Sequence, residues 1–307
     1  MGDVAVITGT THGIGRVTSR ELAKAGRTVV MLCRDLDAGR AVRDEILAQV
    51  PRASLHLVHC DLASLHSVRI SAATVRSAYG RIALLVNNAG MVSTRHRMSV
   101  DGFELTFATN HLGPFLLTTL LLDRLAETAR VINVASRAHF RARADFERVT
   151  NPRARYDAMA AYAQSKLANV LHTFALARRL TGTRICVNCL HPGVVATNLL
   201  PRWLRLIKPL LSREILNVED GARTTLHLAL AADAGAVTGC YFDEHQQVAC
   251  AATLANDVQL QEALWNKSSL WSGVAVTPPR PTGFADTGAT AERAASLAQP
   301  RVIVPNP

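Results

Sequence analysis

An apolar run followed by a glycine-containing loop stands near the start of this chain: Val4-Ala5-Val6-Ile7-Thr8-Gly9-Thr10-Thr11-His12-Gly13-Ile14-Gly15. Its apolar first part, Val4–Thr8, predicts a β-strand, and Ile14–Ala25 predicts a helix. Glycines at such a junction allow a tight turn and let the backbone approach a pyrophosphate group. The N–H groups and the positive dipole end at the start of the helix favour the same anion. The stretch therefore predicts a dinucleotide site, and glycines used only for a turn are the alternative.

Apolar runs and helical patterns alternate along the rest of the chain. The expected strands are Val4–Thr8, Thr28–Arg34, Leu55–Cys60, Ile82–Val86, Arg130–Val134, Ile185–Leu190 and Cys240–Phe242. The expected helices are Ile14–Ala25, Asp37–Val50, Leu65–Tyr79, Phe103–Leu125, Ala160–Leu180 and Asn217–Ala231. This alternation predicts an α/β fold, a single doubly wound parallel sheet with helices on both faces. We expect one domain over residues 1–277, followed by a Pro-, Gly- and Ala-rich tail over residues 278–307.

The composition suits a globular protein with a sizeable core, because 49% of the 307 residues are hydrophobic. The formal charge is +10, which permits binding to nucleic acid or to an anionic membrane. The arginines are scattered, however, and no nucleic-acid motif accompanies them. The apolar run after Asp3 is too short for a secretory or membrane segment. We expect a soluble, cytoplasmic protein without an integral membrane segment or a nucleic-acid partner.

Two of the six cysteines, Cys186 and Cys189, form a lone C-x-x-C. No second pair completes a zinc site, so we expect no metal. The two residues fall in an expected strand, where residues three apart point to opposite faces. Buried free thiols in a reducing compartment are therefore the favoured interpretation.

A second motif carries chemistry: Tyr162-Ala163-Gln164-Ser165-Lys166. In a helix, Tyr162 and Lys166 lie on one face about a turn apart. A cation beside a tyrosine favours the phenolate and lowers its pKa, so the pair can exchange a proton with an alcohol or ketone oxygen. A surface pair is the alternative for this spacing alone. The chain has only four lysines and four tyrosines, which makes a chance pairing less common.

Further polar residues follow the expected strands at their carboxyl ends, where open α/β sheets bind ligands. Arg34 follows the second strand and would pair with a 2′-phosphate, whereas its neighbour Asp35 would favour a 2′-hydroxyl and NAD. Asp61-Leu62 follows the third strand and Asn87-Asn88-Ala89-Gly90 the fourth, both near the expected adenine. An ordinary helix cap is the alternative for Asp61. Ser136 follows the fifth strand, where its hydroxyl could bond a substrate oxygen, with a loop or cap serine as the alternative for this residue taken alone.

These motifs together resemble the short-chain dehydrogenase/reductase family over roughly residues 3–270. They are T-G-x3-G-I-G, N-N-A-G, the strand-end serine, Y-x3-K and His191-Pro192-Gly193-x3-Thr197. Finer features resemble its retinol dehydrogenase and WW-domain oxidoreductase branch. These are Cys33-Arg34-Asp35, Asn110-His111-Leu112-Gly113-Pro114-Phe115, Ser136-x-x-His139, Ser165-Lys166-Leu167-Ala168-Asn169 and Trp265. Thr11 and His12 depart from the Asn-Thr usual in this branch, and Ala135 replaces the first of two usual serines.

The resemblance implies a role for each site residue. Tyr162 would exchange the proton, Lys166 would lower its pKa and bind the nicotinamide ribose, and Ser136 would orient the substrate oxygen. Asn110 would place a water in a proton relay to Lys166, and Val194 with Thr197 would hold the carboxamide. The complete set of expected cofactor-binding residues is Gly9, Thr11, His12, Gly13, Ile14, Gly15, Arg34, Asp61, Leu62, Asn88, Ala89, Gly90, Tyr162, Lys166, Pro192, Gly193, Val195 and Thr197.

We therefore expect an oxidoreductase that interconverts a carbonyl and an alcohol on an apolar small molecule, with NADP(H) preferred and NAD(H) as the alternative. Residues 198–216 mix apolar and basic side chains and are expected to cover the substrate as a lid. A helix buried in the core and, less favoured, a peripheral membrane patch are the alternatives. The competing function is a catalytically silent dinucleotide-binding sensor or scaffold. The sequence leaves a homo-oligomer open.

Overall fold

A computed structural model describes residues 3–275 except 152, 154 and 196–214. The strands are β1 (Val4–Thr8), β2 (Thr28–Cys33), β3 (Leu55–His59), β4 (Ile82–Asn87), β5 (Leu125–Val134), β6 (Cys186–Leu190), β7 (Val194–Val195), β8 (Ile215–Leu216), β9 (Tyr241–Phe242) and β10 (Val248–Ala249). The α-helices are α1 (Gly13–Lys24), α2 (Leu36–Gln49), α3 (Leu65–Ala78), α4 (Leu105–Phe107), α5 (Gly113–Leu121), α6 (Ala158–Arg179), α8 (Val218–Leu230) and α9 (Val258–Ser272).

Eight of these strands form one sheet in the order β10-β9-β6-β5-β4-β1-β2-β3. Every pairing from β3 to β9 is parallel. The chain builds the sheet outward from β1 to β3 and then returns to add β4 on the other side of β1, so the strand order changes direction between β1 and β4. This is the doubly wound sheet that the sequence predicts. One expectation is wrong: Cys240–Phe242 is not the last strand, because β10 follows β9 and pairs with it antiparallel. β10 has two residues, too short to show an alternating pattern.

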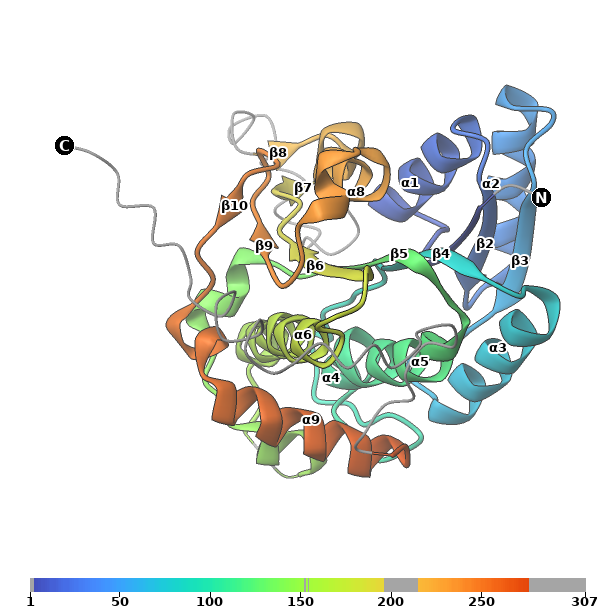
Figure 1. Ribbon diagram of the computed structural model, residues 1–307. Coiled ribbons are helices and arrows are strands. Elements are labelled where there is room, and N and C mark those ends of the chain that lie inside the picture. The colour runs from blue at the N-terminus through green and yellow to red at the C-terminus, as the bar shows by residue number, and fades with distance from the viewer. Residues whose placement is uncertain (1–2, 152, 154, 196–214, 276–307) are drawn as a thin grey trace.

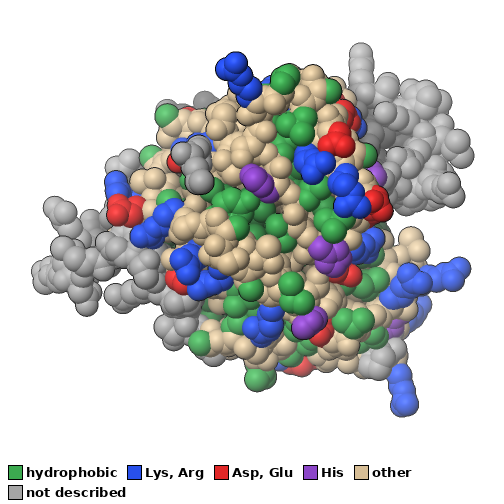
Figure 2. All heavy atoms as spheres, turned by 90° about the vertical axis from the view of Figure 1, so that its right-hand side faces the viewer, with side chains coloured by type: hydrophobic (Ala, Val, Ile, Leu, Met, Phe, Trp, Pro, Cys, Tyr) green, Lys and Arg blue, Asp and Glu red, His purple; other side chains and the backbone are tan. Residues whose placement is uncertain are grey.

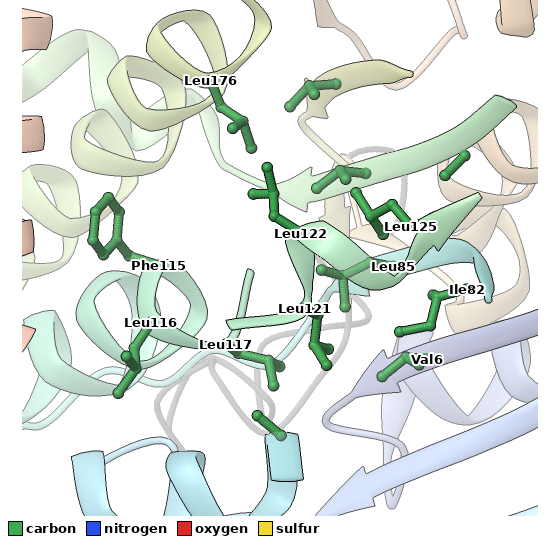
Figure 3. Packing of buried hydrophobic residues seen from close by; sticks show 14 of the residues in the cluster. Val6, Ile82, Leu85, Phe115, Leu116, Leu117, Leu121, Leu122, Leu125 and Leu176 are labelled. Carbon is green, nitrogen blue, oxygen red and sulfur yellow. The ribbon is translucent and has the colours of Figure 1, made fainter. Parts of the chain in front are cut away.

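The sheet carries helices on both faces (Figure 1): α1, α2 and α8 cover one, and α3, α5 and α6 cover the other. Figure 3 shows the packing on the second face: Leu117 of α5 points toward the strands, whereas Phe115 and Leu116 lie on the side of the helix away from them. These three side chains are at most 1% exposed. Such burial contributes about 1.5–3 kcal/mol for each large apolar side chain, so this layer fixes α5 and α6 on the sheet.

Helix α9 is absent from the helices expected from the sequence. It packs on α6 and α5 and buries Trp265, which forms an edge contact with the Phe115 ring at 5.0 Å between centroids. The rest of its buried side is largely polar and includes Gln261, Ser268 and Ser269. A helix that buries serine and glutamine leaves no apolar stripe in its sequence, which explains the omission.

The continuous helical segment Leu105–Arg124 is the one described helix with the length and hydropathy to cross a membrane, and 83% of its most apolar window is buried inside the protein. A π-helical turn over Ala108–Leu112 interrupts it. π-Helical turns inside helices are frequent at functional sites.

Figure 2 shows the molecule from the side that is on the right in Figure 1, where the sheet ends at β3. Lys and Arg side chains are dispersed among neutral and acidic ones on this face. The six cysteines are all free, and Cys186 and Cys189 are both buried, as expected. Thr197, most of the expected lid at 198–216 and the expected tail at 278–307 lie outside the described residues.

Candidate active site

The glycine loop between β1 and α1 packs directly against the Asn87–Gly90 loop that follows β4. Gly9 adopts φ +71°, and a Cβ at this position would lie 2.8 Å from the Cα of Ala89. At Gly15 a Cβ would lie 2.5 Å from Asn88 Nδ2. That amide donates to the carbonyl oxygens of Thr8 and Gly9 at 2.9 and 3.2 Å. Only glycine fits at positions 9 and 15, because a Cβ there would collide with Asn88 or Ala89. Asn88 and Ala89 in turn hold the glycine loop in place.

The start of α1 has no side-chain cap among the described residues. His12 is the N-cap residue, but its side chain accepts no bond from the helix, and the first turn has no acidic residue. The His12 ring instead forms a hydrogen bond with the Thr11 hydroxyl, at 2.9 Å. The first N–H groups of a helix need partners from outside it. The loop of Gly9, Gly13 and Gly15 therefore fits a dinucleotide pyrophosphate, as the sequence predicts.

At the end of β2, the neighbouring side chains of Arg34 and Asp35 differ in their bonding partners. Asp35 caps α2, and its Oδ1 accepts from the N–H groups of Asp37 and Ala38 at 3.0 Å each. Arg34 is exposed and has no ion-pair partner among the described residues. At the end of β3, Asp61 Oδ1 accepts from Ala63 N at 3.0 Å, and Leu62 is buried. The two acids are thus held by local backbone bonds, which leaves Arg34 available to a ligand.

The expected catalytic residues come from separate elements and converge. Tyr162 and Lys166 lie on α6, and Lys166 Nζ is 5.7 Å from the centre of the Tyr162 ring. The same amine donates to the carbonyl oxygen of Val134, at the end of β5, over 2.8 Å. Ser136 follows this strand two residues later, and its hydroxyl is a hydrogen-bond partner of Tyr162. The spacing on α6 and the end of β5 together bring the three side chains into one site.

Without a bound cofactor, burial is the main influence on the pKa values of Tyr162 and Lys166. It raises the pKa of the Tyr162 phenol, and the hydrogen bond with Ser136 lowers that pKa in part. It lowers the pKa of Lys166 to about 8. A low-polarity surrounding disfavours both charged forms. Burial is the larger of the two effects on the pKa of Tyr162, and the hydrogen bond with Ser136 is the one that opposes it.

Asn110 joins the site from the π-helical turn. Its Oδ1 accepts from Met91 N at 2.7 Å, and its Nδ2 donates to Met91 O at 2.9 Å and to Ser165 Oγ at 3.0 Å. A Cβ on Gly90 would lie 3.3 Å from Lys166 Nζ and 3.6 Å from Asn110 Oδ1. Gly90, Asn110 and Lys166 therefore share one small space beside α6.

The segment after β6 reaches the same edge of the sheet. Gly193 adopts φ +82°, and the short strand β7 pairs with β8 beyond it. Val195 is buried and touches Gly221 at the start of α8, where a Cβ would lie 3.1 Å from Val195 Cγ1. Pro192, Gly193 and Val195 thus follow the carboxyl end of β6, and Thr197 is outside the described residues.

Sequence reasoning missed a buried amide network behind the site. Asn87 Nδ2 donates to Thr118 Oγ1 at 2.9 Å and to Asn133 Oδ1 at 2.8 Å. Asn133 Nδ2 donates in turn to Thr173 Oγ1 on α6 at 2.9 Å. The network ties β4, β5, α5 and α6 together beneath the site. Asparagine in the apolar strand runs Ile82–Asn87 and Arg130–Val134 was the available signal, because buried polar groups require partners.

The family model described as short chain dehydrogenase matches residues 3–205. The chain is 38% identical to human retinol dehydrogenase 13 over 284 residues, covering 89% of this chain and 85% of that protein. It is 36% identical to a short-chain dehydrogenase named TIC 32 B, chloroplastic, from Brassica napus, covering 86% and 87% of the two chains.

Among solved structures, an uncharacterised protein from Mycobacterium paratuberculosis superposes with a TM-score of 0.74 at 33% identity, covering 89% of this chain and 94% of the other. A blue fluorescent protein from a metagenomic library in complex with NADPH has a TM-score of 0.64 at 26% identity, with coverages of 79% and 96%. A 3-ketoacyl-(acyl-carrier-protein) reductase from Brucella melitensis complexed with NADH gives 0.63 at 26% identity, with the same coverages. The chain therefore belongs to the short-chain dehydrogenase/reductase family, in its retinol dehydrogenase branch, and is an oxidoreductase acting on CH–OH groups.

Proposed function

We propose that this protein interconverts a carbonyl and an alcohol on an apolar substrate with NADP(H), and that Tyr162, Lys166, Ser136 and Asn110 carry the reaction. The observation behind this proposal is their convergence, with Lys166 Nζ fixed on Val134 O at 2.8 Å and Ser136 bonded to Tyr162. NADP(H), when bound, supplies or accepts the hydride. The protein's own task is then to orient the substrate oxygen and to move one proton.

In this mechanism the Ser136 hydroxyl and the Tyr162 phenol both bond the reacting oxygen of the substrate. In carbonyl reduction Tyr162 donates its proton to that oxygen, and in alcohol oxidation it takes the proton back. The phenolate formed by donation is stabilised by the nearby Lys166 ammonium. Asn110, which is anchored on Met91 and Ser165, lies beside Lys166 and can hold a water that returns the proton.

The preference for NADP(H) is part of the proposal and rests on the end of β2. Asp35 Oδ1 already accepts two backbone N–H bonds as the cap of α2, which holds this carboxylate at the helix start. Arg34 is exposed beside it and provides a charged donor for a 2′-phosphate. NAD(H) remains the competing cofactor, and relatives of similar fold are found with NADPH and with NADH.

Three exposed apolar side chains on segments that adjoin the site support an apolar substrate. Phe140 follows Ser136 and is 53% exposed, Met159 lies one turn before Tyr162 and is 60% exposed, and Val194 follows the Pro-Gly turn and is 47% exposed. An apolar substrate would remove such surfaces from water, at about 25 cal/mol per Å². We further propose that residues 198–216 complete the substrate site and that the protein acts in the cytoplasm.

The decisive experiment follows NADPH oxidation at 340 nm, a general optical readout of this cofactor, across a panel of apolar ketones and aldehydes. The parent and the Tyr162→Phe variant are compared, together with NADPH binding measured by fluorescence. Turnover by the parent alone, with equal binding in both, supports the proposal. Tight NADPH binding without turnover on any substrate in either direction supports the sensor or scaffold instead.

A further inference from the structure

His139 lies between two backbone segments that are far apart in the sequence. It belongs to the 3-10 turn η3 (Arg137–Arg141), directly after Ser136, and its side chain is fully buried. Its Nδ1 lies 2.6 Å from the carbonyl oxygen of Ser136. Its Nε2 lies 3.0 Å from the backbone nitrogen of Ala252, 113 residues further along the chain.

The two partners fix the tautomer of the ring. A carbonyl oxygen can only accept, so Nδ1 must carry the hydrogen that bonds Ser136 O. A backbone N–H can only donate, so Nε2 must present its lone pair to Ala252 N. A charged imidazolium would have a hydrogen on both nitrogens and would lose the second bond. Burial favours the neutral ring as well, because it lowers the pKa of His139. The rings of Phe140 and Tyr241 contribute to this burial and lie 4.2 and 4.9 Å from the imidazole, between centroids.

We infer that His139 is a positioning residue, whose imidazole holds the Ser136 backbone in place for the reaction and anchors it to the segment that leads into α9. This inference rests on the proposed function of Ser136. The carbonyl of Ser136 also accepts from His139 N at 3.1 Å, and its hydroxyl accepts from Ala138 N at 3.2 Å. The backbone N–H and the ring of His139 therefore both bond to the carbonyl of the turn that carries the Ser136 hydroxyl.

Displacement of Ser136 would change the pKa of Tyr162. The Ser136 hydroxyl is the group that lowers the pKa of the Tyr162 phenol against the effect of burial. Movement of the turn would weaken that bond and raise the pKa of the tyrosine. A histidine that only fills space in the core would, on loss, lower stability without moving the pH dependence of turnover.

Two substitutions separate the two bonds of the ring. The amide nitrogen of His139→Asn can take the place of Nδ1 and donate to Ser136 O, but it cannot reach Ala252. The longer side chain of His139→Gln can bring its oxygen to the place of Nε2 and accept from Ala252 N, but it loses the donor at Ser136. His172→Asn is the matched control, because His172 is also buried but contacts Phe115 and Trp265 instead.

The first measurement needs no substrate and tests the geometry in the resting protein. In ¹⁵N-histidine-labelled protein, the His139 signals are identified among the 11 histidines by their loss in the Asn variant, or in the Gln variant if Asn does not fold. Nitrogen shifts of a neutral ring protonated at Nδ1 are the expected result. A ring protonated at Nε2, or a charged ring at neutral pH, would overturn the inference even if the protein proves to have no turnover.

The second measurement is the pH profile of kcat, with KM for NADPH and the melting temperature recorded for each variant. We expect His139→Gln to lower kcat about tenfold, the effect of one hydrogen bond, and to move the profile toward higher pH. His139→Asn should keep the parent profile, and His172→Asn should change only the melting temperature. Equal profiles in the parent and the Gln variant would overturn the inference, whereas an inactive parent would count against the proposed function alone.

Discussion

Lys166 donates from its buried Nζ to the carbonyl oxygen of Val134 over 2.8 Å, and no described carboxylate lies within ion-pair distance of this amine. An ammonium without a counter-ion inside a protein is costly, which is why burial lowers the pKa of Lys166 to about 8. In the proposed mechanism, the lysine is therefore placed for its chemistry at the expense of stability. It is 5.7 Å from the ring of Tyr162, close enough to stabilise a phenolate.

The first prediction concerns the unfavourable free energy of burying the Lys166 ammonium. Because the folded pKa lies below the unfolded value, the lysine contributes instability at neutral pH that disappears as the pH rises through about 8 toward 10.5. Lys166→Met should raise the free energy of unfolding at pH 7 by about 2 kcal/mol, after subtraction of the lost bond to Val134. It should also abolish turnover. Urea unfolding and kinetics test both effects, with the exposed Lys24→Met as control; a less stable Met variant would contradict the account.

The second prediction isolates the proton carrier. Tyr162→Phe removes one hydroxyl and keeps the ring on α6, so cofactor binding should be unchanged while turnover falls by about 10²–10⁴-fold. Tyr156→Phe is a matched control, because Tyr156 bonds Ser93 O and Glu104 rather than the catalytic set. Turnover within a few-fold of the parent in Tyr162→Phe would remove this residue from the mechanism.

The third prediction uses the space shared by Gly90, Asn110 and Lys166. A methyl group at position 90 would lie 3.3 Å from Lys166 Nζ, so Gly90→Ala should displace the amine and lower kcat about tenfold. Gly80→Ala adds the same methyl group where nothing lies within 4 Å, and should leave kcat and the melting temperature near parent values. Equal kinetics in both alanine variants would show that this space does not matter for turnover.

The fourth prediction concerns the cofactor. Arg34→Ala should weaken NADPH binding by roughly tenfold or more and leave NADH binding unchanged, because one charge-assisted hydrogen bond contributes roughly 1.5–3 kcal/mol. Asp35→Ala should instead lower the free energy of unfolding by about 1 kcal/mol through loss of the α2 cap, without changing the cofactor preference. Titration of both cofactors against each variant is the measurement. A preference that follows Asp35 rather than Arg34 would reverse the assignment.

The fifth prediction concerns acid stability. Burial lowers the pKa of His172 to about 3, and Arg179 adds to this effect, so the folded protein keeps the ring neutral. The unfolded chain binds a proton below about pH 6.5, so stability is lost as the pH falls from that value toward 3. His172→Phe should reduce the slope of unfolding free energy against pH by about 1.4 kcal/mol per unit in this window. The exposed His66→Asn variant is the control, and an unchanged slope in His172→Phe would refute the prediction.

Local pattern was enough to predict most of the sheet and the shared side of one helix for Tyr162 and Lys166. The run from Val4 to Gly15 determined a strand, a tight loop and a helix, because chain periodicity and glycine act over a few residues. The separation of Tyr162 and Lys166 likewise placed both on one side of α6, since helical spacing needs no tertiary contact.

Tertiary structure decided which groups those residues meet. Sequence alone left Asp35 open as a ribose ligand, and only the geometry of the α2 start shows it as a cap. The bond of His139 to Ala252 and the buried serines of α9 likewise involve partners that are far away in the chain. Burial raises the pKa of Tyr162 and lowers that of Lys166 for the same reason. Desolvation and hydrogen bonding depend on every segment packed around a group, whereas periodicity records only the neighbours along one segment.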